Sequence, residues 1–122
     1  MGGRMSKCAF LILPFPPKEL SPNKRLHWAQ LSNAKKSYRA QCYYLARHLH
    51  GFYEKDAKLG ISLIFFPPDK RHRDDDNMEA AFKAGRDGVA EALGVNDRFF
   101  SVTRKVSHET LNKVEMFIEE LV

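Results

Sequence analysis

The sequence has few cysteines and no long apolar run. Cys8 and Cys42 are the only cysteines among 122 residues, and they form neither a disulfide framework nor a metal-ligand pattern. We therefore expect two buried thiols in a reducing compartment. No apolar stretch approaches the roughly 20 residues of a membrane-spanning helix, and the start of the chain shows no signal-peptide cleavage site. These absences predict a cytoplasmic protein with no membrane partner.

The composition is that of an ordinary globular protein. Hydrophobic residues make up 43% of the chain and charged residues 29%, which excludes a disordered chain. A chain of 122 residues buries roughly two thirds of its unfolded surface around one core. We expect a single domain over residues 1–122, with residues 1–6 as a flexible start or a cloning remnant.

Four segments have the composition of strands. Residues 8–15 form a continuous apolar run bounded by prolines, which predicts a largely buried strand, and residues 58–66 form a second. Residues 99–107 and 113–122 predict two more strands, with a turn at residues 108–112 between them.

Two segments between these strands show helical spacing of apolar residues. One begins near Trp28 and ends near Gly51, and the other ends at Gly94. The order β-α-β-α-β-β predicts an α/β (α+β) fold with a mixed or antiparallel sheet and both helices on one face. The two apolar stripes comprise Trp28, Leu31, Ala34, Tyr38, Cys42, Leu45 and Leu49, then Met78, Ala81, Phe82, Gly85, Val89, Ala92 and Leu93.

A basic stretch runs directly into three carboxylates in the sequence KRHRDDDN, residues 70–77. One interpretation is helix capping, because carboxylates near a helix N-terminus accept backbone N–H groups and interact favourably with the helix dipole. The other interpretation is a site for a hard cation such as Mg²⁺, which prefers carboxylate oxygens. In an extended chain Asp74 and Asp76 point the same way while Asp75 faces away. A further carboxylate, Asp97, lies in the turn GVNDR, where a structural turn role is the alternative.

These motifs resemble the RusA-type Holliday-junction resolvases, crossover junction endodeoxyribonucleases of bacteria and their phages. The D-x-D-N pattern at residues 74–77 follows a strand and a basic stretch, as in the family. LPFPP at residues 13–17, Asn23, K-x-x-x-D at residues 83–87 and LGVNDRFF at residues 93–100 come in the family's order. The resemblance covers roughly residues 8–120.

The resemblance implies a homodimeric endonuclease that requires Mg²⁺ or Mn²⁺, uses no organic cofactor and cuts four-way DNA junctions symmetrically. Its catalytic, metal-binding acids would be Asp74, Asp76 and Asp97, and Arg73 would match the family's basic residue before the first Asp. The expected setting is DNA recombination and repair in a bacterial cytoplasm, for a protein of phage or host origin.

Ala80 departs from the family pattern, because it stands where the family has a functional lysine. Lys83 is the candidate catalytic replacement, at about 10 Å from Asp76 along the helix axis and near the same face. Alternatively, Lys83 belongs to a surface ladder of i,i+4 pairs with Glu79 and Asp87, each pair contributing only tenths of a kcal/mol. Both interpretations remain open at this point.

The spacing of the acids raises a geometric difficulty. Asp76 precedes the second helix and Asp97 follows it, so a straight helix would separate them by about 25 Å, too far for one metal site. Either the helix breaks near Gly85 or Gly88, or Asp97 of one subunit completes the site of its partner. We favour the second hypothesis.

The formal net charge of +5 and the pI of about 9.3 indicate an anionic partner, and nucleic acid is the commonest one. Stacking on DNA bases is one possible role of His27, Trp28 and Phe99, while core packing is the alternative for Trp28. The residues expected to contact phosphates are Lys24, Arg25, Lys35, Lys36, Arg39, Lys70, Arg71 and Arg73.

Two other functions remain open from the sequence. A non-catalytic DNA-binding protein would also have a basic face and capped helices. A metal nuclease acting on another DNA or RNA structure would carry the same acids, because the acids alone do not select the substrate.

Overall fold

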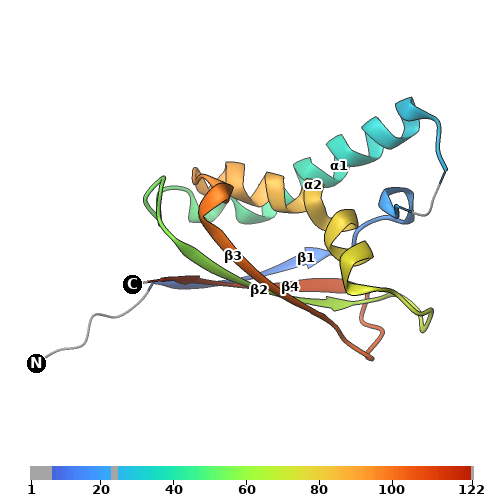
Figure 1. The fold of residues 1–122 in the computed structure, drawn as a ribbon. Coiled ribbons are helices and arrows are strands. Elements are labelled where there is room, and N and C mark those ends of the chain that lie inside the picture. The colour runs from blue at the N-terminus through green and yellow to red at the C-terminus, as the bar shows by residue number, and fades with distance from the viewer. Residues whose placement is uncertain (1–6, 23–24, 122) are drawn as a thin grey trace, which may run out of the picture.

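The computed structural model describes residues 7–22 and 25–121, which form a four-stranded sheet with two helices on one face (Figure 1). The predicted order β-α-β-α-β-β and the α/β (α+β) class are confirmed. Residues 1–6, Asn23 and Lys24 lie outside the described residues, and so do the expectations placed on them. The elements are β1 Cys8–Pro14, α1 Trp28–Ala46, β2 Leu59–Phe66, α2 Asp75–Leu93, β3 Phe100–Val106 and β4 Lys113–Glu120, with 3₁₀ turns Lys18–Leu20, Arg47–Leu49 and Asp97–Phe99.

The sheet is mixed, with the strand order β1-β4-β2-β3. β4 is antiparallel to both β1 and β2, whereas β2 and β3 are parallel. Consecutive strands β3 and β4 are therefore not neighbours, and residues 107–112 carry the chain past the end of β2 instead of forming a hairpin. Two backbone hydrogen bonds hold this crossing, from Ser107 N–H to Phe65 O at 2.8 Å and from Asn112 N–H to Pro67 O at 3.3 Å.

One face of the sheet carries no helix, and this corrects the prediction for the first strand. In β1, Leu11 and Leu13 face the helices and are buried, while Phe10 and Ile12 are exposed on the open face. Cys8 is also exposed, contrary to the expectation of a buried thiol. An uninterrupted apolar run predicted burial on both faces, but the two helices of this chain cover only one.

The apolar stripe predicted for α2 is entirely buried against the sheet and α1. The stripe predicted for α1 is only partly buried: Tyr38 and Cys42 lie in the core, whereas Trp28 is 75% exposed and Leu45 is 45% exposed. Trp28 is the first residue of α1, which extends beyond the sheet at that end (Figure 1). The core-packing interpretation of Trp28 is therefore wrong. No helix in the described ranges is long and apolar enough to cross a bilayer.

Candidate functional site

The three consecutive aspartates form the first turn of α2, at the end of the sheet where β2 stops. Asp74 is the N-cap residue, with an extended backbone (φ −77°, ψ 144°), and Asp75 and Asp76 follow inside the helix. The Asp74 carboxylate accepts no backbone hydrogen bond from this first turn. It accepts one from His72 Nε2 at 3.0 Å instead. The Asp74 side chain therefore does not cap α2. The carboxylates of the first turn still interact favourably with the helix dipole.

Asp76 is held by a residue far along the chain. Arg104 Nη2 donates to Asp76 Oδ1 at 2.6 Å, and Arg104 Nη1 lies 3.0 Å from Glu79 Oε2. Glu79 is also 3.7 Å from Arg86, so the network runs from Asp76 through Arg104 and Glu79 to Arg86. The Asp76 side chain is nevertheless 89% exposed, which leaves its second oxygen accessible to a ligand.

Arg104 was missed in the sequence, although a signal for it exists. In β3, Phe100, Val102 and Val106 alternate with exposed residues and face the helices, and Arg104 occupies the same face. The register confirms this, because Arg104 pairs with Leu63, a buried core residue of β2. A charged residue at an inward position of an alternating strand requires a partner, and α2 supplies two carboxylates.

Arg73 points back into the loop that precedes α2. Its Nη1 donates to Asp69 Oδ1 at 2.9 Å and to Arg71 O at 3.0 Å, and its guanidinium lies 5.6 Å from the centre of the Phe15 ring. Only 18% of the side chain is exposed. The hydrogen bond from Arg73, followed by that from the Arg71 backbone, lowers the pKa of Asp69 below its ordinary value. In this structure Arg73 therefore orders the loop, and its contact with a phosphate stays a prediction.

Asp97 lies at the opposite end of α2 from Asp74 and Asp76. The helix is continuous over Asp75–Leu93, so the hypothesis of a break near Gly85 or Gly88 is wrong. A helix of this length spans about 28 Å. Accordingly, the described ranges contain no group of three or more His, Cys, Asp or Glu side chains that could hold a metal ion. Asp74 and Asp76 lie in the same turn, but their carboxylates contact different partners, His72 and Arg104. Because Asp75 and Asp76 are helical, the extended geometry that was expected to point Asp74 and Asp76 the same way is absent. Asp97 is remote from both.

The two acids at the start of α2 nonetheless suit one common mode of Mg²⁺ binding. Mg²⁺ retains several waters and is often held by one or two carboxylates together with substrate phosphate. Asp74 and Asp76 are both exposed and supply oxygen donors. The chemistry of this donor set fits a hard divalent cation shared with a phosphate.

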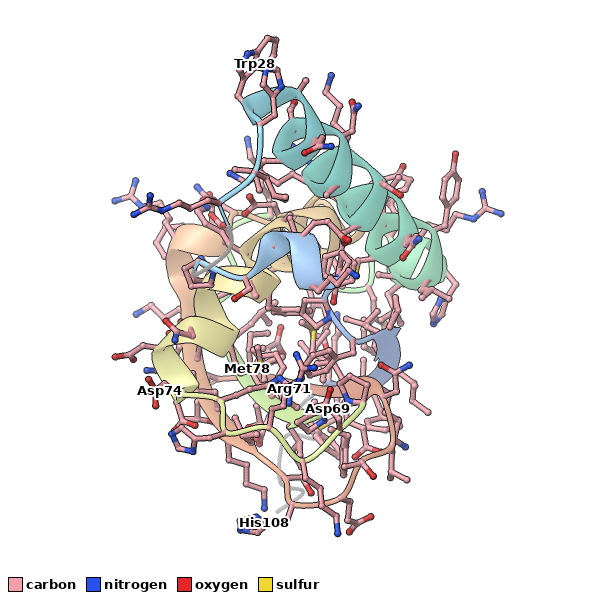
Figure 2. All side chains as sticks on the ribbon, turned by 90° about the vertical axis from the view of Figure 1, so that its right-hand side faces the viewer. Trp28, Asp69, Arg71, Asp74, Met78 and His108 are labelled. Atoms are coloured by element: carbon pink, nitrogen blue, oxygen red, sulfur yellow. The ribbon has the colours of Figure 1, made fainter. Side chains whose placement is uncertain are left out.

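Two of the predicted phosphate-binding residues, Lys70 and Arg71, lie on the loop that precedes Asp74. Figure 2 looks onto this end of the molecule and shows Asp74 at the start of α2, beside the loop that carries Asp69 and Arg71. Arg25, Lys70 and Arg71 are exposed, whereas Lys24 lies outside the described residues. Exposed cations on this loop lie next to the carboxylates, and their contact with phosphate stays a prediction.

Lys83 and the aromatic candidates occupy different surroundings. Lys83 Nζ is 3.5 Å from Asp87, so half of the predicted surface ladder is present, while Glu79 contacts Arg104 and Arg86 instead.

His27 caps α1 by accepting a hydrogen bond from Ala29 N–H at 3.2 Å, and its ring lies 5.6 Å from that of Trp28. The exposed His27–Trp28 pair is accessible for stacking, and Phe99, which is half-buried, is less so.

Comparison with known proteins identifies one relative and no family. No family model matches the chain. The chain is 44% identical over 93 residues to a protein of Xylella fastidiosa described only as uncharacterized. The match covers 74% of this chain and 61% of that protein, so the chain spans less than two thirds of its relative's length. The resemblance to RusA-type resolvases therefore stays a prediction from the motifs.

Proposed function

We propose that this protein is a Mg²⁺- or Mn²⁺-dependent endodeoxyribonuclease that resolves four-way DNA junctions in the cytoplasm of a bacterium, as a homodimer acting in recombination and repair. The observation that carries the proposal is the exposure of the Asp74 and Asp76 carboxylates beside a basic loop. Both are exposed at the start of α2, next to a basic loop, and their carboxylates contact His72 and Arg104. This placement makes both acids available to a divalent ion and a phosphate.

Each part of the site has a role in the proposed reaction. Asp74 and Asp76 hold the divalent ion, which when bound supplies an activated water and neutralises charge on the phosphoryl group. Lys70 and Arg71, both exposed on the loop before α2, contact backbone phosphates and position the strand. Arg104, within reach of Asp76, carries a guanidinium suited to a phosphate oxygen once the carboxylate binds an ion.

Asp97 joins the proposal through a second copy of the chain. Because the unbroken α2 separates it from Asp76, a site with all three acids requires Asp97 of the partner subunit. Two such composite sites in a symmetric dimer make two cuts, as junction resolution demands.

Mixed dimers test this arrangement directly. A dimer with Asp76→Asn in one subunit and Asp97→Asn in the other retains one intact composite site and nicks one strand. The matched dimer, with both substitutions in one subunit and none in the other, has no intact composite site. If the second dimer cuts and the first does not, each site is built within one chain and the composite arrangement is wrong.

Cleavage assays test the activity itself. Four-way junction, duplex and single-stranded DNA are compared with Mg²⁺ or with EDTA. We expect metal-dependent nicking of the junction, reduced about a hundredfold or more in Asp76→Asn. Asp75→Asn is the matched control and should retain about the wild-type rate. If no substrate is nicked in a metal-dependent way, the proposal of an endonuclease is wrong. If duplex or single-stranded DNA is nicked as fast as the junction, the proposal of a junction resolvase is wrong.

A second candidate is a non-catalytic DNA-binding protein, and one observation favours it. Arg104 already neutralises Asp76 at 2.6 Å, as expected for a purely structural ion pair. This alternative predicts junction binding that weakens with salt, because phosphate contacts release counterions, but that does not change when Mg²⁺ replaces EDTA. The same assays distinguish the two functions.

A further inference from the structure

The two helices form a wedge that is closed at one end. A Cβ added at Gly88 would lie 2.3 Å from Arg39 O, and one added at Gly85 would lie 2.6 Å from Tyr38 Cε2. The absence of side chains at these two glycines therefore lets α1 and α2 come into close contact. From this point toward their N-termini the helices diverge (Figure 1). The wedge thus opens toward the end of the molecule that carries the aspartates.

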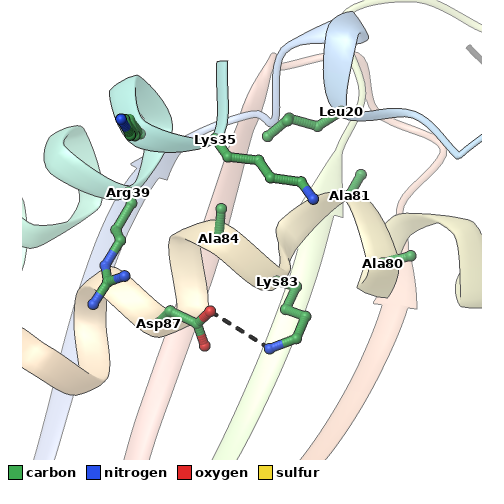
Figure 3. A pocket seen from close by; sticks show the side chains of 9 residues that line it. Leu20, Lys35, Arg39, Ala80, Ala81, Lys83, Ala84 and Asp87 are labelled. Carbon is green, nitrogen blue, oxygen red and sulfur yellow. Dashed lines mark hydrogen bonds and ion pairs between the residues drawn. The ribbon is translucent and has the colours of Figure 1, made fainter. Parts of the chain in front are cut away.

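A cavity of about 280 Å³ occupies the open part of this wedge. Its apolar wall combines Leu20 from the 3₁₀ turn with Ala80, Ala81 and Ala84 of α2. Small side chains on this face of α2 leave the space unfilled. Figure 3 shows Lys35 and Arg39 on the α1 side of the cavity and Lys83 with Asp87 on the α2 side; Lys36 completes the lining.

The charges around the cavity favour an anion. Four cationic side chains and one carboxylate line it. Arg39 is paired with Glu91 at 2.6 Å and Lys83 with Asp87 at 3.5 Å. Lys35 and Lys36 make no ion pair within the described ranges, so the cationic side chains of the cavity outnumber its one carboxylate, Asp87.

The cavity adjoins a second hollow at the acidic end of α2. A second hollow of about 270 Å³ is lined by Asp76, Glu79, Ala80, Lys83 and Arg86, and Ala80 and Lys83 also line the first cavity. Along α2, Ala80 lies about 6 Å from Asp76, and a nucleic-acid strand places one phosphate about every 3.4 Å of helical rise. The cavity is therefore within a few nucleotides of the candidate metal site.

We propose that the α1–α2 cavity binds one unstacked nucleotide of the DNA strand next to the cut. The base lies against Leu20 and the alanines, and its phosphate contacts Lys35 and Lys36. The volume of about 280 Å³ lies just below the usual range of ligand pockets, which suits a single nucleotide. Enzymes that extrude a base from the stack hold it between aromatic or apolar side chains. The choice of DNA as the source of the nucleotide rests on the proposed function.

Binding measured without metal tests the pocket apart from cleavage. Deoxynucleoside monophosphates and a short single-stranded oligonucleotide are titrated in EDTA while the NMR signals of the Ala80, Ala81 and Ala84 methyl groups are followed. We expect saturable shifts of these signals and at least tenfold weaker binding in Lys35→Gln/Lys36→Gln. The charge-matched control Lys58→Gln/Lys105→Gln, at exposed positions away from the cavity, should bind the mononucleotides as the wild type does.

Filling the cavity provides a second test. Ala84→Leu should abolish mononucleotide binding, and Ala80→Leu at the exposed rim should weaken it without disturbing the core. Inorganic phosphate binding as tightly as the mononucleotides, or no shift with any of these probes, would overturn the proposal. Metal-dependent nicking without nucleotide binding in this cavity would refute only the proposed nucleotide pocket. Nucleotide binding in the cavity without metal-dependent nicking would refute only the proposed endonuclease function.

Discussion

The two ends of α2 are built in opposite ways. At its C-terminus, Gly94 adopts a left-handed conformation (φ 73°), its N–H bonds to Ala90 O and Glu91 O, and Leu93 and Val95 are buried. At its N-terminus the residues are exposed carboxylates whose partners are side chains from the preceding loop and from β3. The difference teaches that the packed end positions the helix, while the open end retains charged groups for a ligand.

The contact between α1 and α2 also differs from one end of the helix pair to the other. Near Gly88 the backbones touch, whereas near Ala80 they enclose a cavity. Stability and ligand binding are thus assigned to different ends of the same helix pair, and substitutions at the two ends should have different consequences.

The thiol of Cys42 reports how tightly the closed end is packed. Burial raises the pKa of Cys42 to about 12, so almost none of it is thiolate at pH 8, and the side chain is also fully shielded from reagents. In a Cys8→Ser background we expect alkylation of the native protein to be at least about a hundredfold slower than that of a free thiol, measured by mass spectrometry. Unfolding in guanidinium should restore the rate. Fast alkylation of the native protein would show that this end opens readily.

Gly88→Ala should break the closed end of the helix pair. Alanine is favoured over glycine in a helix by about 1 kcal/mol, but its Cβ would lie 2.3 Å from the Arg39 carbonyl oxygen. Because both groups are on backbones that cannot move apart cheaply, we expect the free energy of unfolding to fall by about 3 kcal/mol in denaturant titrations. Asp75→Ala at the open end should change it by only tenths. A stabilised Gly88→Ala variant would contradict the tight contact.

Arg104→Gln should alter the open end while leaving the closed end intact. Loss of its pairs with Asp76 and Glu79 should lower stability by about 1 kcal/mol or less, because Asp76 is exposed. Releasing Asp76 should strengthen Mn²⁺ binding up to about fivefold, measured by electron paramagnetic resonance, if that carboxylate is a ligand. Lys105→Gln is the matched control on the same strand. Unchanged or weaker Mn²⁺ binding would show that Arg104 and the ion do not compete.

The loop before α2 should show a small pH dependence of stability. Because Arg73 and the Arg71 N–H lower the pKa of Asp69 in the folded state, their contribution is present above the ordinary Asp pKa of about 3.9 and is lost as the pH falls through the folded value. The difference in melting temperature between wild type and Asp69→Asn should therefore narrow between pH 6 and pH 3. If the difference in melting temperature stays constant over this range, the interaction between Asp69 and Arg73 is not its cause.

Much of the fold could be predicted because its signals are local. The spacing of apolar residues in α2 and the glycine at its end identified the helix and its buried face correctly. The wrong predictions of burial share one cause, which is that local sequence does not show whether a second layer packs over a strand or helix. Phe10 and Ile12 belong to an apolar run, and Trp28 to a helical stripe, yet all three are exposed because no second layer covers the open sheet face or the projecting start of α1.

The candidate site was predictable only in part. Asp74 and Asp76 stand out in the sequence as neighbouring carboxylates after a basic stretch, and the separation of Asp97 followed from helix length. Arg104 was missed, since its contact with Asp76 spans 28 residues and depends on the register of β3 beside β2.

By itself, the sequence determined the order of elements, the buried face of α2 and the charge of the loop before it, because periodicity and turn residues act over a few neighbours. Only the tertiary structure decided that α2 runs unbroken between the acids, that Arg104 neutralises Asp76, and that a basic cavity opens beside Ala80. These features arise where segments distant in sequence meet, and their geometry depends on strand register and helix crossing, which no local pattern encodes.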